Sequence, residues 1–497
     1  MSWEQLPVET TSDIFSYLHD DDDGTREYAD HGHPTLCALG LTCRRLSSVA
    51  ISQLYGDIVF EVNRKEAKDL ERLRLFDRAC RANPSLVDRI LSVNVRYFED
   101  ADTHAEAYDE LLRHLAASKS LKRLESQLSS HKSGSPLPAL YDHHSGSFPA
   151  VTHLQVQLDH VEKEHFLPAE RLSRLCELPA LEQLTVMAPI GGIRDQAKLR
   201  EMGTQPFPHL KHLHFWCARP VSLDALQIML PRAPNLTCLS LGLPGSSTEV
   251  NRKYSDDSSS LGYDLDGPVQ PRLYGELLAP VKSSLTSLEL DADNVHYPSH
   301  DGSRIDLSAF ANLTTLKLSC ALVFGSDMAP ALNEGLWRLL PPRLEHLSVG
   351  FDGYQGLYWS LHDMRSHARE HKFAELWRHR LEESSVDWVV SLLKRKGEQN
   401  NILKSITIEE REIIDRDPNW KIGVWKGAYR LGEMAAAVGV ELVIRLRVPR
   451  NFESDEMEGA EEPWHVGKPG TVSYADDVDP NTPSDDGDAH SSGDEST

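Results

Sequence analysis

The chain of 497 residues is poor in cysteine, and its seven cysteines are scattered, with no C-x-x-C pair among them. Disulfide frameworks and structural zinc sites need cysteines at short, regular spacings. The pattern therefore excludes both classes and favours a reducing compartment. We expect the protein in the cytoplasm or the nucleus.

Long apolar runs are also absent from the sequence. No stretch approaches the roughly 20 apolar residues that a membrane-spanning helix needs. The first residues, MSWEQLPVE, contain neither the basic nor the apolar region of a signal peptide. We therefore expect no membrane association and no signal peptide.

Basic residues are in deficit: 52 lysines and arginines stand against 76 acidic residues, a net charge of −24. This balance argues against a nucleic-acid partner bound through a basic face. Residues 451–497 alone hold 14 acidic residues and one lysine, Lys468, which is −13 of the total. With so few apolar side chains, we expect this acidic C-terminal tail to be disordered.

The motifs of common catalytic sites are missing as well: there is no GxxxxGK[ST], no GxSxG and no HExxH. His212 and His214 would share one face of a strand, but two imidazoles without a third ligand make a weak metal site. The acidic stretch after Leu18 begins with His19, where a calcium loop requires an acid. We expect a non-catalytic protein with no cofactor and no metal site.

What the sequence does contain is one repeated phrase, in which apolar residues stand at the first, fourth and sixth positions. Successive good copies start 30, 29, 26, 49, 28 and 31 residues apart, and a weaker copy follows 59 residues later. The copies are VTHLQV (Val151), LEQLTV (Leu181), LKHLHF (Leu210), LTCLSL (Leu236), LTSLEL (Leu285), LTTLKL (Leu313) and LEHLSV (Leu344), with weaker ILSVNV (Ile90) and LKSITI (Leu403).

The irregular intervals have simple interpretations. We read the interval of 49 residues as one unit with a loop insertion at about 244–271. The interval of 59 residues could hold a degenerate repeat. A second low-complexity loop is expected at about 125–147, upstream of Val151.

Most phrases follow a proline-containing pair, as in LPAL and FPHL, and are followed by helix-like stretches. Proline ends the preceding helix and favours an extended approach to the strand. Each unit therefore predicts a turn, a short strand and a helix, and stacked units share one core. The sequence resembles the leucine-rich repeat family over residues 84–450, with irregular repeats. The resemblance implies an α/β solenoid, a horseshoe with a parallel sheet on its concave side.

Strand alternation predicts which side chains face the concave surface, because residues between the buried apolar positions point the other way. This polar face is the expected target-binding surface, and the aromatic Trp216 is its expected anchor. The candidate target-binding residues are His153, Gln155, Gln183, Thr185, His212, His214, Trp216, Glu289, Asp291, Lys317 and His346.

The first 60 residues predict a small all-α module of three short helices. Leu6 and Pro7 begin the first helix, and Val8, Ile14, Phe15 and Leu18 recur at helical spacing. LPVE, followed by LTCRRLSSVAISQLY with Cys43 and Arg44, resembles the F-box family. Between Leu18 and Cys43 lie 24 residues, more than the family usually has, and the excess forms an acidic insertion at about 19–34. A connecting helix is expected over residues 61–83.

The combined resemblance is to an F-box protein with leucine-rich repeats, of the fungal type. It implies a substrate-recognition adaptor of a cullin-based E3 ubiquitin ligase: the F-box docks on a Skp-family adaptor, and the repeats bind an unknown target protein. The alternative is a ligase-independent leucine-rich scaffold with a degenerate F-box. The residues that the resemblance assigns to the Skp-family adaptor are Leu6, Pro7, Ile14, Phe15, Leu18, Leu36, Leu39, Cys43 and Arg44.

Overall fold

In the computed structural model of the chain, most of the described residues belong to the repeat region. The described residues are 38, 49–50, 54–63, 67–98, 102–129, 147–159, 167, 169–187, 205–215, 223–242, 263–264, 270–291, 295–296, 301–324, 335–351, 355–356, 359–360, 387–399, 402–410, 420–424 and 429–449. The acidic tail, the acidic insertion and most of the first 53 residues lie outside this part of the chain.

The described residues form a sheet of thirteen strands in which twelve neighbours run parallel and the last strand, β16, pairs antiparallel with β17. In spatial order the strands are β1 (Asp57–Asn63), β2 (Ser92–Phe98), β3 (Arg123–Ser129), β4 (His153–Asp159), β5 (Gln183–Met187), β6 (His212–Phe215), β7 (Cys238–Gly242), β9 (Ser287–Asp291), β11 (Thr315–Ser319), β12 (His346–Phe351), β15 (Ser405–Glu410), β17 (Glu441–Pro449) and β16 (Trp420–Val424). This arrangement is that of an α/β solenoid.

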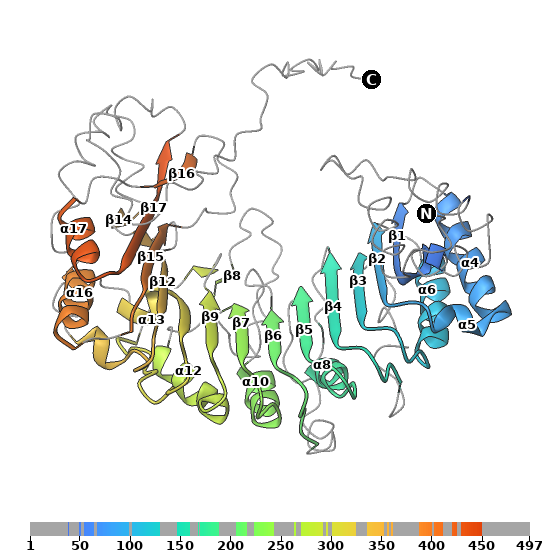
Figure 1. Cartoon of the computed structure of the whole chain (residues 1–497), viewed down its shortest axis with the longest axis horizontal. Helices are drawn as coiled ribbons and strands as arrows, with labels where there is room; N and C mark the ends of the chain where they lie inside the picture. The colour runs from blue at the N-terminus through green and yellow to red at the C-terminus, as the bar shows by residue number, and fades with distance from the viewer. Residues whose placement is uncertain are drawn as a thin grey trace, which may run out of the picture.

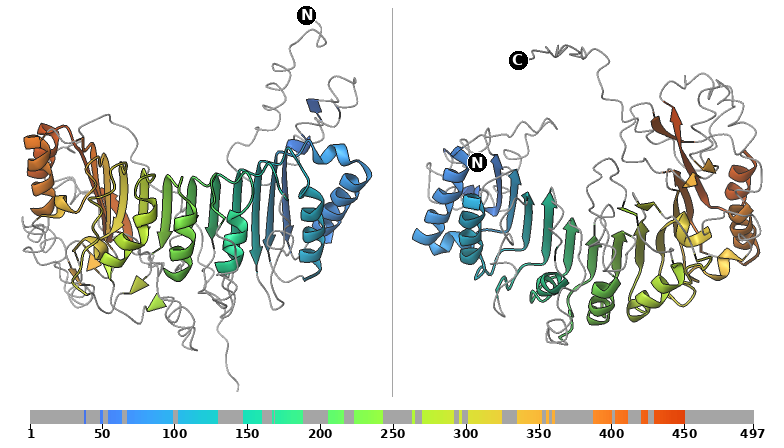
Figure 2. Two further views of the ribbon diagram at one scale, coloured as in Figure 1. Left: turned by 90° about the horizontal axis from the view of Figure 1, so that it is seen from below. Right: turned by 180° about the vertical axis from the view of Figure 1, so that it is seen from behind.

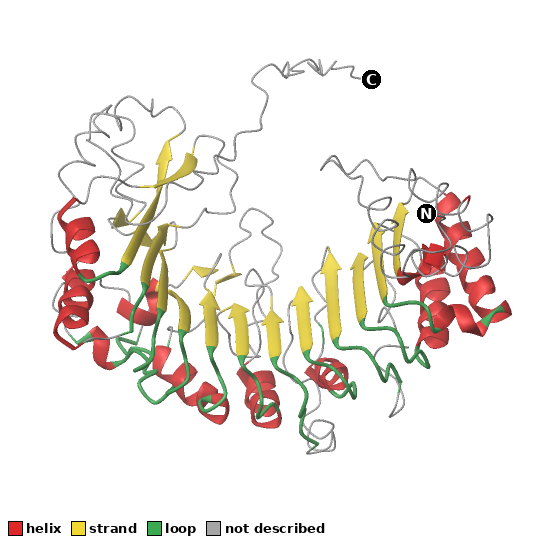
Figure 3. Ribbon diagram, viewed as in Figure 1, coloured by secondary structure: helices red, strands yellow, loops and turns green. Residues whose placement is uncertain are grey.

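The sheet bends into an arc whose inner side is lined by strands and whose outer side is covered by helices (Figures 1 and 3). The two further views in Figure 2 show the same order of layers along the arc. The helices are α4 (Ala67–Ala82), α5 (Pro84–Val87), α6 (Asp102–Leu115), α8 (Ala169–Cys176), α10 (Leu223–Met229), α12 (Pro271–Leu278), α13 (Cys320–Phe324), α16 (Asp387–Gln399) and α17 (Tyr429–Ala437), with 3-10 turns η2 (Leu230–Arg232), η3 (Ala279–Val281) and η5 (Leu336–Arg338).

Two small sheets of short strands complete the described structure. β8 (Tyr263–Asp264) pairs parallel with β10 (Val295–His296), and β13 (Gln355–Gly356) pairs antiparallel with β14 (Trp359–Ser360). Of the helices in the described part of the chain, none has both the length and the apolar character needed to span a bilayer.

The apolar positions of the repeated phrase build the core between sheet and helices. Leu181, Leu184 and Val186 of one copy are buried, and so are Leu313, Leu316 and Leu318 of another. Each of the nine copies of the phrase contributes such a trio to one continuous cluster. Because a unit buries its apolar side only against its neighbours, the stack is stable as a whole.

The proline-containing pairs form a recurrent turn that leads into each strand. In LPAL the backbone N–H of Leu181 donates to the carbonyl of Leu178 (3.2 Å), and in FPHL Leu210 donates to Phe207 (3.3 Å). A hydrogen bond of this span closes a β-turn, whose second position favours the fixed φ of proline. The first residue of the pair is buried, which anchors the turn in the core.

Threonine hydroxyls connect neighbouring units at the second position of the phrase. Thr286 Oγ1 donates to the carbonyl of Thr237 (3.0 Å), and Thr314 Oγ1 donates to the carbonyl of Thr286 (3.2 Å). Asn312 Nδ2 adds a similar bond to the carbonyl of Ser283 (2.7 Å). The carbonyls of Thr237 and Thr286 also accept backbone N–H bonds from the next unit, so each threonine hydroxyl adds a further bond to a carbonyl that already joins two units.

The structure corrects the start of the loop expected at about 125–147, and residues 130–146 of that loop lie outside the described part of the chain. β3 occupies Arg123–Ser129, pairs with β2 and β4, and belongs to a unit that begins at Leu121. Its phrase, LKRLES, ends in Ser126 instead of an apolar residue, and that serine is buried. The polar residue at a core position broke the pattern, although the small side chain still fits the core.

Strand pairing shows whether the two long intervals between phrases contain an additional strand of the main sheet. β7 pairs with β9, so the 49-residue interval adds no further strand to the main sheet between them. β12 pairs with β15 in the same way, so the 59-residue interval holds no degenerate repeat strand in that sheet either. The extra residues include α16, whose Trp388 is buried against Phe324 (ring centroids 5.3 Å apart).

Candidate functional site: the concave face and the F-box-like segment

Parallel register aligns polar side chains into rows across the concave face. One row, which we call the middle row, crosses ten strands and would span about 43 Å at ~4.8 Å per strand. Its members are Asn94, Glu125, Gln155, Thr185, His214, Ser240, Glu289, Lys317, Ser348 and Thr407.

A second row lies two residues earlier on each strand, on the same face. Between β2 and β15 it comprises Ser92, Arg123, His153, Gln183, His212, Cys238, Ser287, Thr315, His346 and Ser405. Of these, Arg123, His212, Thr315 and His346 are exposed. The face therefore offers a partner a continuous strip of hydrogen-bonding groups.

Glu289 joins three strands at the middle of the face. Its Oε2 accepts a hydrogen bond from Ser240 Oγ (2.7 Å), and its Oε1 lies 2.6 Å from Lys317 Nζ. The side chains of Lys317 and Glu289 are 37% and 29% exposed, so the pair stays accessible from the concave side. Such bonding holds both side chains in position, which lowers the entropy cost of binding a partner.

A histidine and a cysteine lie beside this group. The rings of His212 and His214 meet edge to face with centroids 6.3 Å apart, and Cys238 Sγ lies 3.9 Å from His214 Nε2. Burial lowers the pKa of His214, the neighbouring His212 lowers it further, and Glu289 opposes both. Burial raises the pKa of the Cys238 thiol; a hydrogen bond from Ser287 opposes this, and Glu289 raises it further. His214 and Cys238 are therefore both neutral near pH 7.

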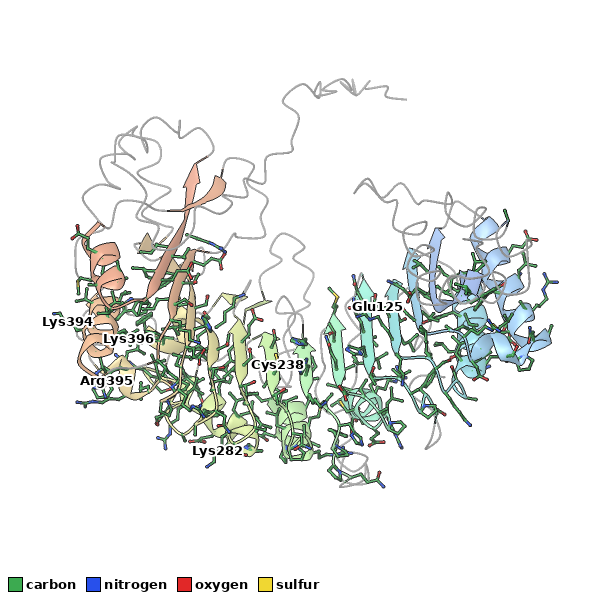
Figure 4. The ribbon with its side chains drawn as sticks, in the orientation of Figure 1. Glu125, Cys238, Lys282, Lys394, Arg395 and Lys396 are labelled. Carbon is green, nitrogen blue, oxygen red and sulfur yellow. The ribbon has the colours of Figure 1, made fainter. Side chains whose placement is uncertain are left out.

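Cations on the concave face lie next to carboxylates. Arg123 Nε is 3.9 Å from Glu125 Oε1, and Arg445 Nη1 is 3.4 Å from Glu409 Oε1. Asn94 Nδ2 also donates to Glu125 (2.8 Å). The described face is thus polar and close to neutral, although the whole chain carries −24. Figure 4 labels Glu125 and Cys238 on this face.

The register puts nine of the eleven candidate target-binding residues in the two rows. They are His153, Gln155, Gln183, Thr185, His212, His214, Glu289, Lys317 and His346. The backbone of Asp291 lies opposite Gly242 at the end of β9. Trp216, the expected anchor, lies outside the described residues.

Sequence reasoning missed the ends of the face. Asn94 and Glu125 at one end, and Thr407 and Arg445 at the other, belong to units whose phrases are weak or broken. The signal was present in ILSVNV and LKSITI, where the spacing holds but leucine is partly replaced. Among the described residues, no group of three or more His, Cys, Asp or Glu is arranged to hold a metal ion.

The end of the N-terminal module is packed into the solenoid. Val49 and Ala50 are buried, and the Tyr55 ring stacks on Phe76 of α4 (centroids 6.2 Å). Phe60 of β1 approaches the same Phe76 ring (5.4 Å). β1 pairs along its full length with β2, so the main sheet begins at Asp57, within the last residues of the N-terminal module expected over residues 1–60. The expected connecting segment contains α4, which packs on β1 and α6.

The residues assigned to the Skp-family adaptor fall outside the described part of the chain. They are Leu6, Pro7, Ile14, Phe15, Leu18, Leu36, Leu39, Cys43 and Arg44.

Comparison with known proteins bears on the N-terminal segment. No curated protein matches the chain. Residues 3–61 match the family model described as F-box-like. The matched segment includes Tyr55 and ends within β1, the first strand of the main sheet. The chain thus carries an F-box-like domain whose last residues are part of its α/β solenoid.

Proposed function

We propose that this protein is the substrate-recognition adaptor of a Skp/cullin/F-box-type E3 ubiquitin ligase, acting in the cytoplasm or the nucleus. The observation that carries the proposal is the F-box-like domain at residues 3–61, which runs directly into the first strand of the solenoid. F-box domains in general bind a Skp-type adaptor, and they are typically found in non-catalytic proteins. Ubiquitin transfer would belong to partner subunits.

The concave face is the proposed target-binding surface, and we assign the solenoid to the leucine-rich repeat type. Supporting this assignment are the repeated phrase, the parallel sheet and the row of partly exposed polar side chains around Glu289. Holding a target and a ligase together raises their effective concentration without any new chemistry.

The competing proposal is a leucine-rich scaffold that works without a ligase. The 24 residues between Leu18 and Cys43, including four consecutive aspartates, favour it, because they enlarge the F-box between its docking elements. Binding to a Skp-family adaptor separates the two proposals, since only the ligase adaptor requires it.

The first experiment mixes the full chain with a purified Skp-family adaptor and measures complex formation. Leu6→Ala with Pro7→Ala should weaken binding by at least about tenfold, because apolar anchors dominate such helix-in-groove contacts. Leu75→Ala is the matched control, since Leu75 is an apolar residue that is 49% exposed on α4, beyond the F-box-like segment. No binding by the wild type, or unchanged binding by the double variant, supports the scaffold instead.

The second experiment addresses the target. Proximity labelling with the full chain should lose its strongest partners in Thr315→Arg, which adds a bulky charge to the concave face. Gln227→Arg adds the same charge to an exposed position of α10, among the helices of the outer side. If both variants retain the same partners, targets bind elsewhere on the chain.

A further inference from the structure

A cluster of cations lies on the outer side of the solenoid, near its C-terminal end. Lys394, Arg395 and Lys396 follow one another on α16, and Arg338 belongs to η5, which packs against that helix. We call these four residues the basic patch. Figure 4 labels its three α16 residues on the outer side of the arc.

The patch is built around a tryptophan. The guanidinium carbon of Arg395 lies 3.1 Å from the centroid of the Trp337 ring, and that of Arg338 lies 5.0 Å from the same centroid. Cation–π attraction thus gathers two like charges on one indole. Their mutual repulsion remains, and a nearby anion would relieve it.

Basic residues outnumber acids in the segments that form the patch. Residues 335–344 contain two basic residues and no acid, and α16 contains three basic residues, with its two acids, Asp387 and Glu398, near its ends. In the whole chain, by contrast, acids outnumber bases by 76 to 52. Lys396 already interacts with another group of the protein. For Lys394, Arg395 and Arg338 we find no ion pair within the described residues. The patch is therefore a local concentration of positive charge on an acidic protein.

The same chain supplies a segment of opposite charge. β17 ends at Pro449, and residues 451–497 follow with 14 acids and one lysine. Six of these acids fall within residues 453–462, and six more fall within 476–488. β17 packs on α17, which packs on α16, so the tail begins at the end of the solenoid that carries the patch.

Length permits the contact. β17 has 9 residues, so a path along the whole strand measures about 30 Å, which roughly ten extended residues can cover. The tail has 47 residues beyond Arg450, enough to reach the patch with several acidic groups at once. Tethering keeps the local concentration of these groups in the millimolar range, so weak individual ion pairs suffice.

We propose that the acidic C-terminal segment 451–497 docks in cis on the basic patch formed by Arg338, Lys394, Arg395 and Lys396. The segment neutralises the repelling guanidiniums and covers the end of the solenoid. The proposal does not depend on ligase binding.

The test uses the full chain and a carbodiimide, which joins a lysine amine to a carboxylate in direct contact. Lys394 should form amide links to acids of 451–497, detected as cross-linked peptides by mass spectrometry. Lys282 is the internal control, because it is also exposed and lies on the turn after η3. At about 50 mM salt we expect at least tenfold more tail links at Lys394 than at Lys282, and near-equal yields at about 500 mM, because salt screens exposed charges.

Two further arms separate the alternatives. Arg338→Glu leaves the Lys394 amine in place and should lower the yield of tail links at Lys394 several-fold. Arg74→Glu makes the same charge change at an exposed position of α4 and should leave that yield unchanged. Mixing ¹⁵N-labelled and unlabelled chains identifies the donor of the tail. Equal links at Lys394 and Lys282 in low salt, equal effects of the two charge variants, or mostly mixed-isotope links would each overturn docking in cis.

Discussion

Arg232 and Glu177, 55 residues apart in sequence, form a salt bridge between the unit of β6 and the unit of β4, which are separated by the unit of β5; the distance between Nη2 and Oε1 is 3.0 Å. Arg232 also donates to Ser173 Oγ (2.6 Å) and to the carbonyl of Gln205 (2.8 Å). Its guanidinium lies 4.2 Å from the Phe207 ring centroid. One arginine, with a side chain only 8% exposed, therefore connects helix, turn and core.

Arg232→Ala should destabilise the protein by about 3 kcal/mol, because it leaves Ser173 and Glu177 without a buried cationic partner. Arg174→Ala is the matched control: Arg174 pairs with the same Glu177 at 3.3 Å but is 51% exposed, so its loss should cost less than about 1 kcal/mol. Urea unfolding followed by circular dichroism measures both. Equal losses in the two variants would contradict the role of burial.

Gly439→Ala should destabilise the protein by about 1 kcal/mol through the backbone alone. Gly439 has a φ of +69° after α17, where it donates to the Ala436 carbonyl (3.1 Å) and Val440 donates to that of Ala435 (2.9 Å). A Cβ added at Gly439 would have no other atom within 4 Å, and the same holds for a Cβ added at Gly56. The two positions differ in backbone conformation, because the φ of Gly56 is not positive. Gly56→Ala should therefore change the unfolding free energy by less than about 0.5 kcal/mol. A similar loss in both variants would exclude left-handed strain as the cause.

His214 should make stability depend on pH below neutrality. Its pKa is lowered below the ordinary value of 6.5, so the unfolded chain takes up this proton at a higher pH than the folded chain does. The contribution of neutral His214 to the free energy of unfolding is complete above the ordinary pKa. This contribution is lost as the pH falls towards the lowered pKa of the folded chain. His214→Gln should reduce the loss of unfolding free energy between about pH 7.5 and 5.5. The exposed His346→Gln keeps His214 and should show the wild-type loss.

Thiol alkylation should proceed in the order of burial. Burial raises the pKa of Cys80 to about 11, with a smaller contribution from Asp77, and burial raises the pKa of Cys176 as well. Because the thiolate is the reactive form, iodoacetamide at neutral pH should label the half-buried Cys238 before Cys80, Cys176 and the buried Cys320. Peptide mass spectrometry resolves the sites, and labelling in urea should abolish the order. Early modification of Cys176 in the native chain would contradict it.

Local patterns in the sequence were enough to predict the repeating unit and its facing. The apolar trio, such as Leu181, Leu184 and Val186, has the spacing of a strand with one buried face, and the preceding proline marks the turn. The same alternation predicted that Glu289 and Lys317 face the concave side. These features depend on residues close together in the chain, so a single sequence contains them.

Only the tertiary structure decided which units are neighbours and which side chains meet across them. The direct pairing of β12 with β15 across 59 residues, and the buried bond from Arg232 to Ser173, follow from how whole units stack. Ser126 shows the limit of pattern reading, because the stack accepts a small polar residue where the phrase calls for an apolar one. The sequence by itself thus determined the unit, since periodicity is local. The order of strands and the contacts between units were decided by packing between residues far apart in the chain.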